Sequence, residues 1–242
     1  MILLIALLLA ASDGAALDRS CKAGKAAACH ELGRLYQSGR GVPQDLARAA
    51  TLLKRSCKLG DPDGCADDAM AAVLGQGQPA NPVPALARLE TLCKQGHPLA
   101  CADLGALFAQ GYGKEAGAAR APKLLASACD AGVPAACRNL AFELSKKNDL
   151  EGANKLADRA CAGGDPEGCL LLGDLFGKSN DVLRAGVAYA KACDAGLPAG
   201  CYGQAMILIQ TGADREKGKD LLDKACKGGD GRACRAELNP EL

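Results

Sequence analysis

Apolar and polar residues alternate along the chain with a helical period, and short glycine-rich stretches interrupt the pattern. Leu32, Leu35 and Tyr36, for example, fall on one side of a helix. Leu52 and Leu53 do so in the next apolar segment. Apolar residues spaced three and four apart predict amphipathic helices that each bury one stripe. The pattern therefore predicts an all-α chain of short helices joined by turns.

The predicted helices repeat together with the cysteines. Seven stretches, called brackets here, have the form C-x7-C, such as CKLGDPDGC at residues 57–65, and together they use all 14 cysteines. The first cysteines are separated by 36, 36, 36, 32, 32 and 33 residues, a period typical of helix-hairpin solenoids. The seven brackets are Cys21 and Cys29, Cys57 and Cys65, Cys93 and Cys101, Cys129 and Cys137, Cys161 and Cys169, Cys193 and Cys201, and Cys226 and Cys234.

Each bracket predicts a helix end, a tight turn and a helix start. A glycine stands three places after every first cysteine, where it suits a left-handed helix cap. Two places further, five brackets have a proline, which suits the first turn of a new helix. We call the helix after each second cysteine the A helix, and the helix running into the next first cysteine the B helix. The glycines are Gly24, Gly60, Gly96, Gly132, Gly164, Gly196 and Gly229, and the prolines are Pro62, Pro98, Pro134, Pro166 and Pro198.

Small residues occupy the same position in successive A helices and the same position in successive B helices, and we call these positions the small columns. Small side chains there let the two helices of a pair approach closely. No single pair can bury its apolar stripe, so stacked neighbours must supply the core. The loops between A and B are longer in the first three hairpins, such as residues 38–44, than in the last three, such as residues 146–149. The small columns are Gly33, Ala69, Gly105, Ala141, Gly173 and Ala205 in A, and Ala49, Ala85, Ala121, Ala153, Ala185 and Gly218 in B.

Composition agrees with a helical fold and excludes some partners. Of the 242 residues 49% are hydrophobic but only 3% aromatic, which is thin for one large core. The formal net charge is +1, so we expect neither nucleic acid nor an anionic membrane as a partner.

The apolar start MILLIALLLAAS resembles a secretory signal, although no lysine or arginine precedes it. It is too short to span a bilayer, which needs about 20 residues. We predict cleavage between Ala11 and Ala16 and no stable membrane insertion afterwards. Residues 18–20 before Cys21 make a poor lipobox, so no lipid anchor is expected. The predicted organisation is a signal peptide at 1–16, a capping half-repeat at 17–28, six helix-pair repeats with a C-terminal capping turn at 29–236, and a tail at 237–242.

The stretch LGRLYQSGRGVPQDLARAATLLKRSCKLGDPDGC, residues 32–65, resembles the Sel-1-like repeat, a relative of the tetratricopeptide repeat. The cysteine brackets make the chain similar to the cysteine-rich Hcp type of exported bacterial Sel-1-like protein. The GRGV loop of the first repeat matches best, GQGQ and GYGK follow, and repeats 4–6 lack this loop. The resemblance implies a right-handed α-solenoid of antiparallel helix pairs, with a disulfide in each repeat, that acts as an adaptor for other proteins.

A disulfide within each bracket also fits the expected turn, because a short turn can bring two Cα atoms within about 4.4–6.8 Å. Fourteen cysteines after a signal-like start favour an oxidising compartment, periplasmic or extracellular. A zinc site of four thiolates from different repeats stays open as an alternative, although no C-x2-C pair occurs. Redox catalysis is a weaker alternative for the same reason.

No constellation in the sequence predicts catalysis, a cofactor or a metal site. Proteins of the Hcp type are sometimes labelled β-lactam-binding or β-lactam-hydrolysing, and such an enzyme is the alternative function. Its serine form needs S-x-x-K and K-T-G, which the chain lacks. Its zinc form needs more histidines than His30 and His97, and His97 is interpreted as a solvated turn residue. Asp61 and Asp165, just before turn prolines, are interpreted as helix N-caps.

A partner is expected on the concave face, which A helices usually line in such solenoids. Positions two and five past each second cysteine should point away from the core. For Phe142 a rotation of its helix, placing Phe142 in the core and Glu143 outside, stays open, and so does a core role for the two methionines. The candidate partner-binding residues are Glu31, Arg34, Asp67, Met70, Asp103, Asn139, Phe142, Asp174 and Met206. The sequence thus predicts an exported scaffold that binds other proteins or peptides.

Overall fold

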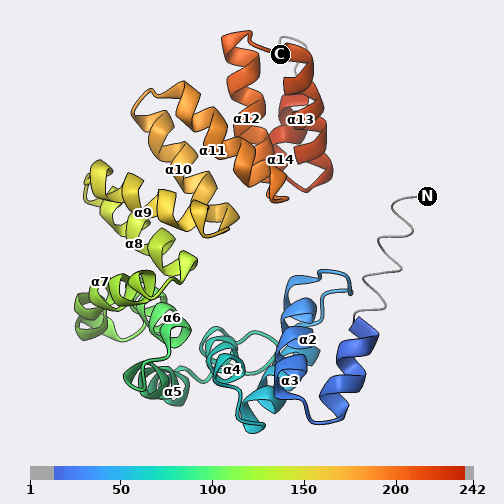
Figure 1. Ribbon diagram of the computed structural model, residues 1–242, viewed down its shortest axis with the longest axis vertical. Coiled ribbons are helices and arrows are strands. Elements are labelled where there is room, and N and C mark those ends of the chain that lie inside the picture. Colours follow the sequence, from blue (N-terminus) through green and yellow to red (C-terminus); the bar gives the residue numbers. More distant parts are fainter. Residues whose placement is uncertain (1–13, 238–242) are drawn as a thin grey trace. The chain divides into compact units, whose positions relative to one another are not determined.

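A computed structural model describes residues 14–237. Within this range all regular secondary structure is helical, and turns or short loops join the helices (Figure 1). The first helix covers residues 14–22. The A helices are α2 (Ala26–Ser38), α4 (Pro62–Leu74), α6 (Pro98–Ala109), α8 (Pro134–Lys146), α10 (Pro166–Lys178) and α12 (Pro198–Thr211). The B helices are α3 (Leu46–Lys58), α5 (Pro82–Lys94), α7 (Lys114–Asp130), α9 (Leu150–Ala162), α11 (Val182–Asp194) and α13 (Arg215–Lys227), and α14 (Gly231–Glu237) follows.

The chain forms two compact units, Met1–Leu107 and Phe108–Leu242, and the division falls inside α6. In each unit helices pack against the next one along the chain, for example α2 on α3 and α3 on α4 in unit 1, and α8 on α9 in unit 2. A helices also contact the next A helix, as α2 does α4, α8 does α10 and α10 does α12. Each unit is therefore a stack of antiparallel helix pairs, as the sequence predicts.

The turn between each B helix and the next A helix has the same hydrogen bonds at all seven brackets. In the second bracket the Gly60 N–H donates to the Cys57 carbonyl at 3.0 Å, and the Asp61 N–H donates to the Ser56 carbonyl at 3.2 Å. These two bonds form a Schellman motif, which needs a left-handed residue. All seven predicted cap glycines have φ between 85° and 97°, and the five predicted prolines each begin an A helix. The prediction of the turn is confirmed.

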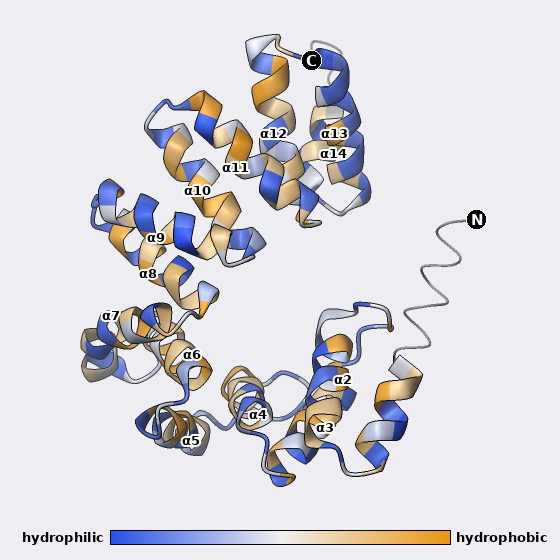
Figure 2. Ribbon diagram, viewed as in Figure 1, coloured by the Kyte–Doolittle hydropathy of each residue, from blue (hydrophilic) through white to orange (hydrophobic). Residues whose placement is uncertain are grey.

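Buried leucines and the alanines of the small columns make up most of the core. Figure 2 shows that hydrophobic residues recur in helix after helix along the chain. An added Cβ at Gly33 would lie 2.9 Å from the Leu53 side chain. An added Cβ at Gly218 would lie 2.6 Å from Ile209. Every alanine of the two columns is buried. Close helix approach over small residues therefore replaces the large aromatic core that the composition lacks.

Loop lengths agree with the sequence except in the third hairpin. Residues 39–45 and 75–81 connect the first two pairs, and residues 147–149, 179–181 and 212–214 connect the last three. The third connection, residues 110–113, is shorter than predicted, because α7 begins earlier and has 17 residues where α3 and α5 have 13. Gly117 lets the ring of Phe108 pack against the additional turn, since an added Cβ there would lie 2.9 Å from the ring.

A substitution at one cap glycine tests the turn. Gly132 has φ +87° and open space around an added Cβ, so Gly132→Ala should lower the free energy of unfolding by about 1 kcal/mol through backbone strain alone. The matched control is Gly186→Ala inside α11, where a Cβ would meet only Ile207 at 3.8 Å. That change should stabilise by about 0.5–1 kcal/mol. Guanidinium unfolding followed by circular dichroism measures both, and equal effects would contradict the account of the turn.

Candidate functional site: the junctions and the A-helix face

A disulfide crosses every junction between a B helix and the next A helix. The two cysteines of each bracket lie with S–S distances of 1.96–2.05 Å and Cα–Cα distances of 4.3–4.7 Å. Each pair joins the last turn of one helix to the first turn of the next, so it fixes the angle between them. The bonded pairs are Cys21 with Cys29, Cys57 with Cys65, Cys93 with Cys101, Cys129 with Cys137, Cys161 with Cys169, Cys193 with Cys201, and Cys226 with Cys234.

These pairs are the seven brackets of the sequence, and no cysteine among the described residues is free. The second cysteines are as deeply placed as the first: Cys29 is fully buried, and Cys137, Cys169 and Cys201 are buried as well. Cys234, in the last pair, lies inside the short helix α14, which follows α13. In this arrangement the cysteines are part of the packed junctions and leave no thiolate for a metal or for redox chemistry.

Carboxylates cap two of the A helices at these junctions. Asp61 accepts a hydrogen bond from the Asp63 N–H at 3.2 Å, and Asp165 accepts one from the Glu167 N–H at 3.2 Å. Both residues are the N-caps that the sequence predicts, of α4 and α10. The buried Ser56 hydroxyl lies 2.7 Å from the Asp61 carboxylate and thereby links the cap to the end of α3.

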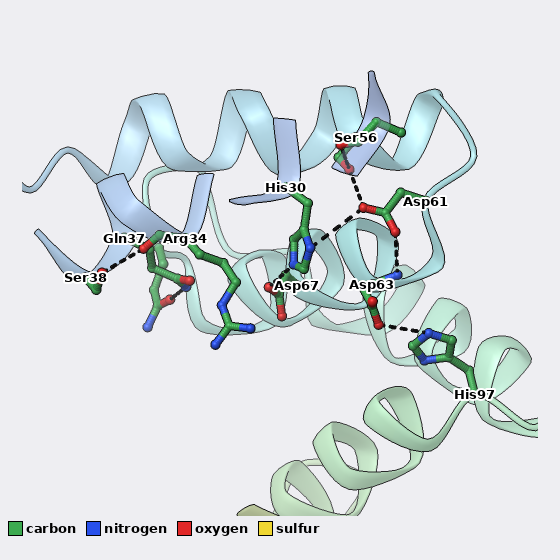
Figure 3. Close-up of polar contacts among 11 residues, drawn as sticks. His30, Arg34, Gln37, Ser38, Ser56, Asp61, Asp63, Asp67 and His97 are labelled. Carbon is green, nitrogen blue, oxygen red and sulfur yellow. Dashed lines mark hydrogen bonds and ion pairs between the residues drawn. The ribbon is translucent and has the colours of Figure 1, made fainter. Parts of the chain in front are cut away.

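His30, in α2, reaches across to α4 (Figure 3). Its Nε2 lies 2.8 Å from Asp67 Oδ2 and its Nδ1 lies 3.8 Å from Asp61 Oδ2. The hydrogen bond to Asp67 raises the pKa of His30 against the opposing effect of burial. The protonated imidazole is therefore an ionic link between two A helices of unit 1.

His97 lies at the turn before α6, as predicted, but it is not a solvated turn residue. The Ala100 N–H donates to His97 Nδ1 at 3.3 Å, and Nε2 lies 3.1 Å from Asp63 Oδ1 (Figure 3). Its side chain is only 19% exposed. The interpretation as a solvated residue was wrong because the ring itself caps α6 and contacts the start of α4.

Unit 2 uses an arginine at the position that corresponds to His30. Arg138, like His30, directly follows the second cysteine of its bracket. Its Nε lies 2.7 Å from Asp165 and its Nη1 lies 2.5 Å from Glu167. The same column thus links an A helix to the next junction in both units. Only the link in unit 1 depends on a proton near neutral pH, because a guanidinium stays charged.

In unit 1 the predicted partner residues form a polar face. Glu31 and Arg34 are exposed and line an open hollow of about 560 Å³ that His30 also lines. Asp67 is bonded to His30, and Met70 is half-buried.

Asp103 lies partly buried on α6, and its Oδ2 is buried with no hydrogen-bond partner. Burial raises the pKa of Asp103 to about 7; the negative charge of Asp67 adds to this rise, and Arg34 opposes it.

In unit 2 the predicted residues separate into exposed and packed ones. Phe142 is 49% exposed, with Lys146 Nζ 4.4 Å from its ring centroid, so the alternative that puts Phe142 in the core is wrong. Glu143 is half-buried and paired with Lys146 at 2.9 Å. Met206 packs against the core around α12. Asn139 is half-buried, and Asp174 is exposed and accepts a hydrogen bond from the Tyr189 hydroxyl at 2.7 Å.

Residues 14–237 contain neither a candidate metal cluster nor a candidate membrane span. No group of three or more histidine, cysteine, aspartate or glutamate side chains there could hold a metal ion. In the same part of the chain, no helix has both the length and the apolar character needed to cross a bilayer.

Stacked antiparallel helix pairs of this length define a helix-pair repeat protein. The family model described as Sel1 repeat matches residues 26–61, 98–133 and 201–230. The chain therefore contains Sel1 repeats, and the seven cysteine pairs show its cysteine-rich character. No curated protein matches the chain.

Solved structures share the fold at low identity. A Sel1 repeat protein from Oxalobacter formigenes is 21% identical with a TM-score of 0.63, over 89% of this chain and 96% of that one. A protective antigen of uropathogenic Escherichia coli with an SLR fold is 21% identical with a TM-score of 0.61. That match covers 91% of this chain, which spans half of the antigen. An immunity protein from Pseudomonas aeruginosa is 19% identical with a TM-score of 0.55, over 76% and 74% of the two chains.

The two proton-binding groups predict how stability depends on pH. The pKa of His30 is raised, so its contribution is complete below about pH 6.5 and is lost as pH rises through the folded-state pKa. Folded Asp103 keeps its proton up to about pH 7, whereas the unfolded chain releases it near 3.8. Both groups therefore make unit 1 less stable at pH 8 than at pH 5.

Asp103→Asn should remove most of this loss, because an amide does not ionise. The expected difference is up to about 4 kcal/mol in the free energy of unfolding between pH 4 and pH 8. Guanidinium unfolding of the disulfide-intact protein at several pH values measures it, with Asp174→Asn in unit 2 as the control for lost charge. A wild-type curve as flat as that of Asp103→Asn would contradict the assignment.

Proposed function

We propose that this protein is an exported scaffold without catalytic activity, which binds other proteins through the A-helix face, defined here as the positions two and five past each second cysteine. The observation that carries the proposal is the disulfide at each of the seven junctions. Such bonds persist in oxidising compartments and are rare in the cytosol. The compartment is therefore the periplasm or the medium, with residues 1–16 as the signal, most of which lies outside the described residues.

A binding role fits a chain whose helix junctions are cross-linked by disulfides and whose A helices carry exposed side chains outside the core. Glu31 and Arg34 are exposed in unit 1, and Phe142 is exposed in unit 2. Sel1 and tetratricopeptide-like repeats typically bind proteins on such extended surfaces. An exposed aromatic ring is a suitable anchor for a partner, because aromatic residues often dominate binding energy.

Site-specific photocrosslinking in the exporting host tests this face. A photoreactive phenylalanine analogue at Phe142 should give a discrete cross-linked product with another protein. Leu183, on the B helix α11, is the matched control because it is 85% exposed but lies off the A-helix face. No product at Phe142, or the same product from Leu183, would contradict the proposed face.

The absence of catalysis is tested on the same purified protein. We expect no hydrolysis of a chromogenic β-lactam above the rate of a buffer blank. Hydrolysis that persists through further purification steps and that follows the protein peak would contradict a purely binding role.

A further inference from the structure

Two carboxyl groups on the A-helix face of unit 1, those of Asp67 and Asp103, have no lysine or arginine bonded to them among the described residues. Asp67, two places past Cys65, is bonded to His30 at 2.8 Å. Asp103, two places past Cys101, has a buried Oδ2 without a hydrogen-bond partner among the described residues. An unpaired buried carboxylate oxygen is costly, so this site is poised to accept a donor.

The charge of the face depends on these two protons. With His30 protonated and Asp103 neutral, the three positive groups of this face balance its three negative groups. The positive groups are His30, Arg34 and Arg40, and the negative groups are Glu31, Asp61 and Asp67. Loss of both protons leaves an excess of two negative charges. The charged groups around the two sites, on α2, the loop after it and α4, are Glu31, Arg34, Arg40, Asp61 and Asp67.

We propose that the A-helix face of unit 1 binds a partner segment carrying lysine or arginine, whose basic side chains pair with the carboxylates of Asp67 and Asp103. A cationic side chain at Asp67 takes the place of protonated His30, which releases its proton to the solvent. At the second site, a lysine or arginine side chain of the partner pairs with the ionised carboxylate of Asp103. This inference rests on the proposed scaffold function and names the chemistry of its partner.

The pKa values place this exchange close to neutral pH. The pKa of His30 is raised by its bond to Asp67, and the pKa of Asp103 is raised to about 7 by burial. Binding of a basic segment should therefore tighten as the pH rises from 6 to 8. For one proton released by a group with a pKa near 7, the expected change in affinity is about tenfold.

Unit 2 provides an internal comparison. The positions that correspond to Asp67 and Asp103 are Asn139, Leu171 and Gly203, which do not ionise. The position that corresponds to His30 is Arg138, which stays charged and paired with Asp165 at 2.7 Å. At the position of His30 unit 2 also has Leu170 and Tyr202, so the His30–Asp67 pair and the Asp103 carboxyl have no counterpart at the corresponding positions of unit 2.

The test uses the full disulfide-bonded chain and a fluorescent hexalysine amide, with hexaglutamate as the opposite probe. Anisotropy titrations run at pH 6, 7 and 8 at constant salt. Calorimetry at pH 7 in two buffers of different ionisation heat counts the protons released. The wild type should bind hexalysine at least about tenfold more tightly at pH 8 than at pH 6, with net proton release.

The variants separate the possible outcomes. Asp103→Asn should bind more weakly than the wild type at pH 8 and lose the part of the pH dependence that Asp103 contributes, whereas Asp158→Asn, a charge loss on the exposed side of the B helix α9 in unit 2, should behave like the wild type. His30→Gln should bind more tightly than the wild type at pH 6, because Asp67 then lacks its imidazolium.

Equal wild-type affinity at pH 6 and 8, preferred binding of hexaglutamate, or an unchanged pH profile in Asp103→Asn would each overturn the inference. If a partner is still cross-linked through Phe142 in that case, the scaffold function stands without it. If no partner is cross-linked while hexalysine binds as expected, the proposed scaffold function fails. The pH-dependent binding of basic segments at Asp67 and Asp103 then stands by itself.

Discussion

The turn between each B helix and the next A helix is the constraint on which the rest of the structure depends. A left-handed glycine, two Schellman hydrogen bonds and a disulfide fix the direction in which the next helix leaves, and in five of the seven turns a proline begins that helix. With the direction fixed, alanine and glycine columns meet at close range, and leucines such as Leu32 and Leu53 fill the space above them. A chain with 3% aromatic residues can then build a continuous core from small contacts between neighbours.

At two junctions the same geometry places a side chain where it meets the start of the next A helix. The residue after the second cysteine makes this link: His30 contacts the carboxylates at α4, and Arg138 contacts those at α10. The two links are equivalent in position but differ in chemistry, because an imidazole loses its charge near neutral pH and a guanidinium does not. A repeat fold can therefore give one unit a proton-dependent surface while its neighbour keeps a constant one.

Local features of the fold could be predicted from the sequence, whereas contacts between repeats could not. The cap glycines, the prolines and the N-caps Asp61 and Asp165 each depend on a few neighbouring residues, and all are confirmed. The link between His30 and Asp67 joins residues 37 apart and needs the relative placement of α2 and α4. The third loop was predicted too long because its extra residues continue α7, and the core alternative for Phe142 failed because Glu143 pairs with Lys146.

Non-reducing peptide mapping by mass spectrometry, on protein exported from its own host, tests the central claim most directly. The account predicts seven disulfides, each within one bracket, from Cys21 with Cys29 to Cys226 with Cys234, and an N-terminus that begins after the apolar run. Free thiols, bound zinc or cystines between different brackets would contradict it. In that case the junctions would owe their geometry to the glycine turn alone, and the inference of an oxidising compartment would fail.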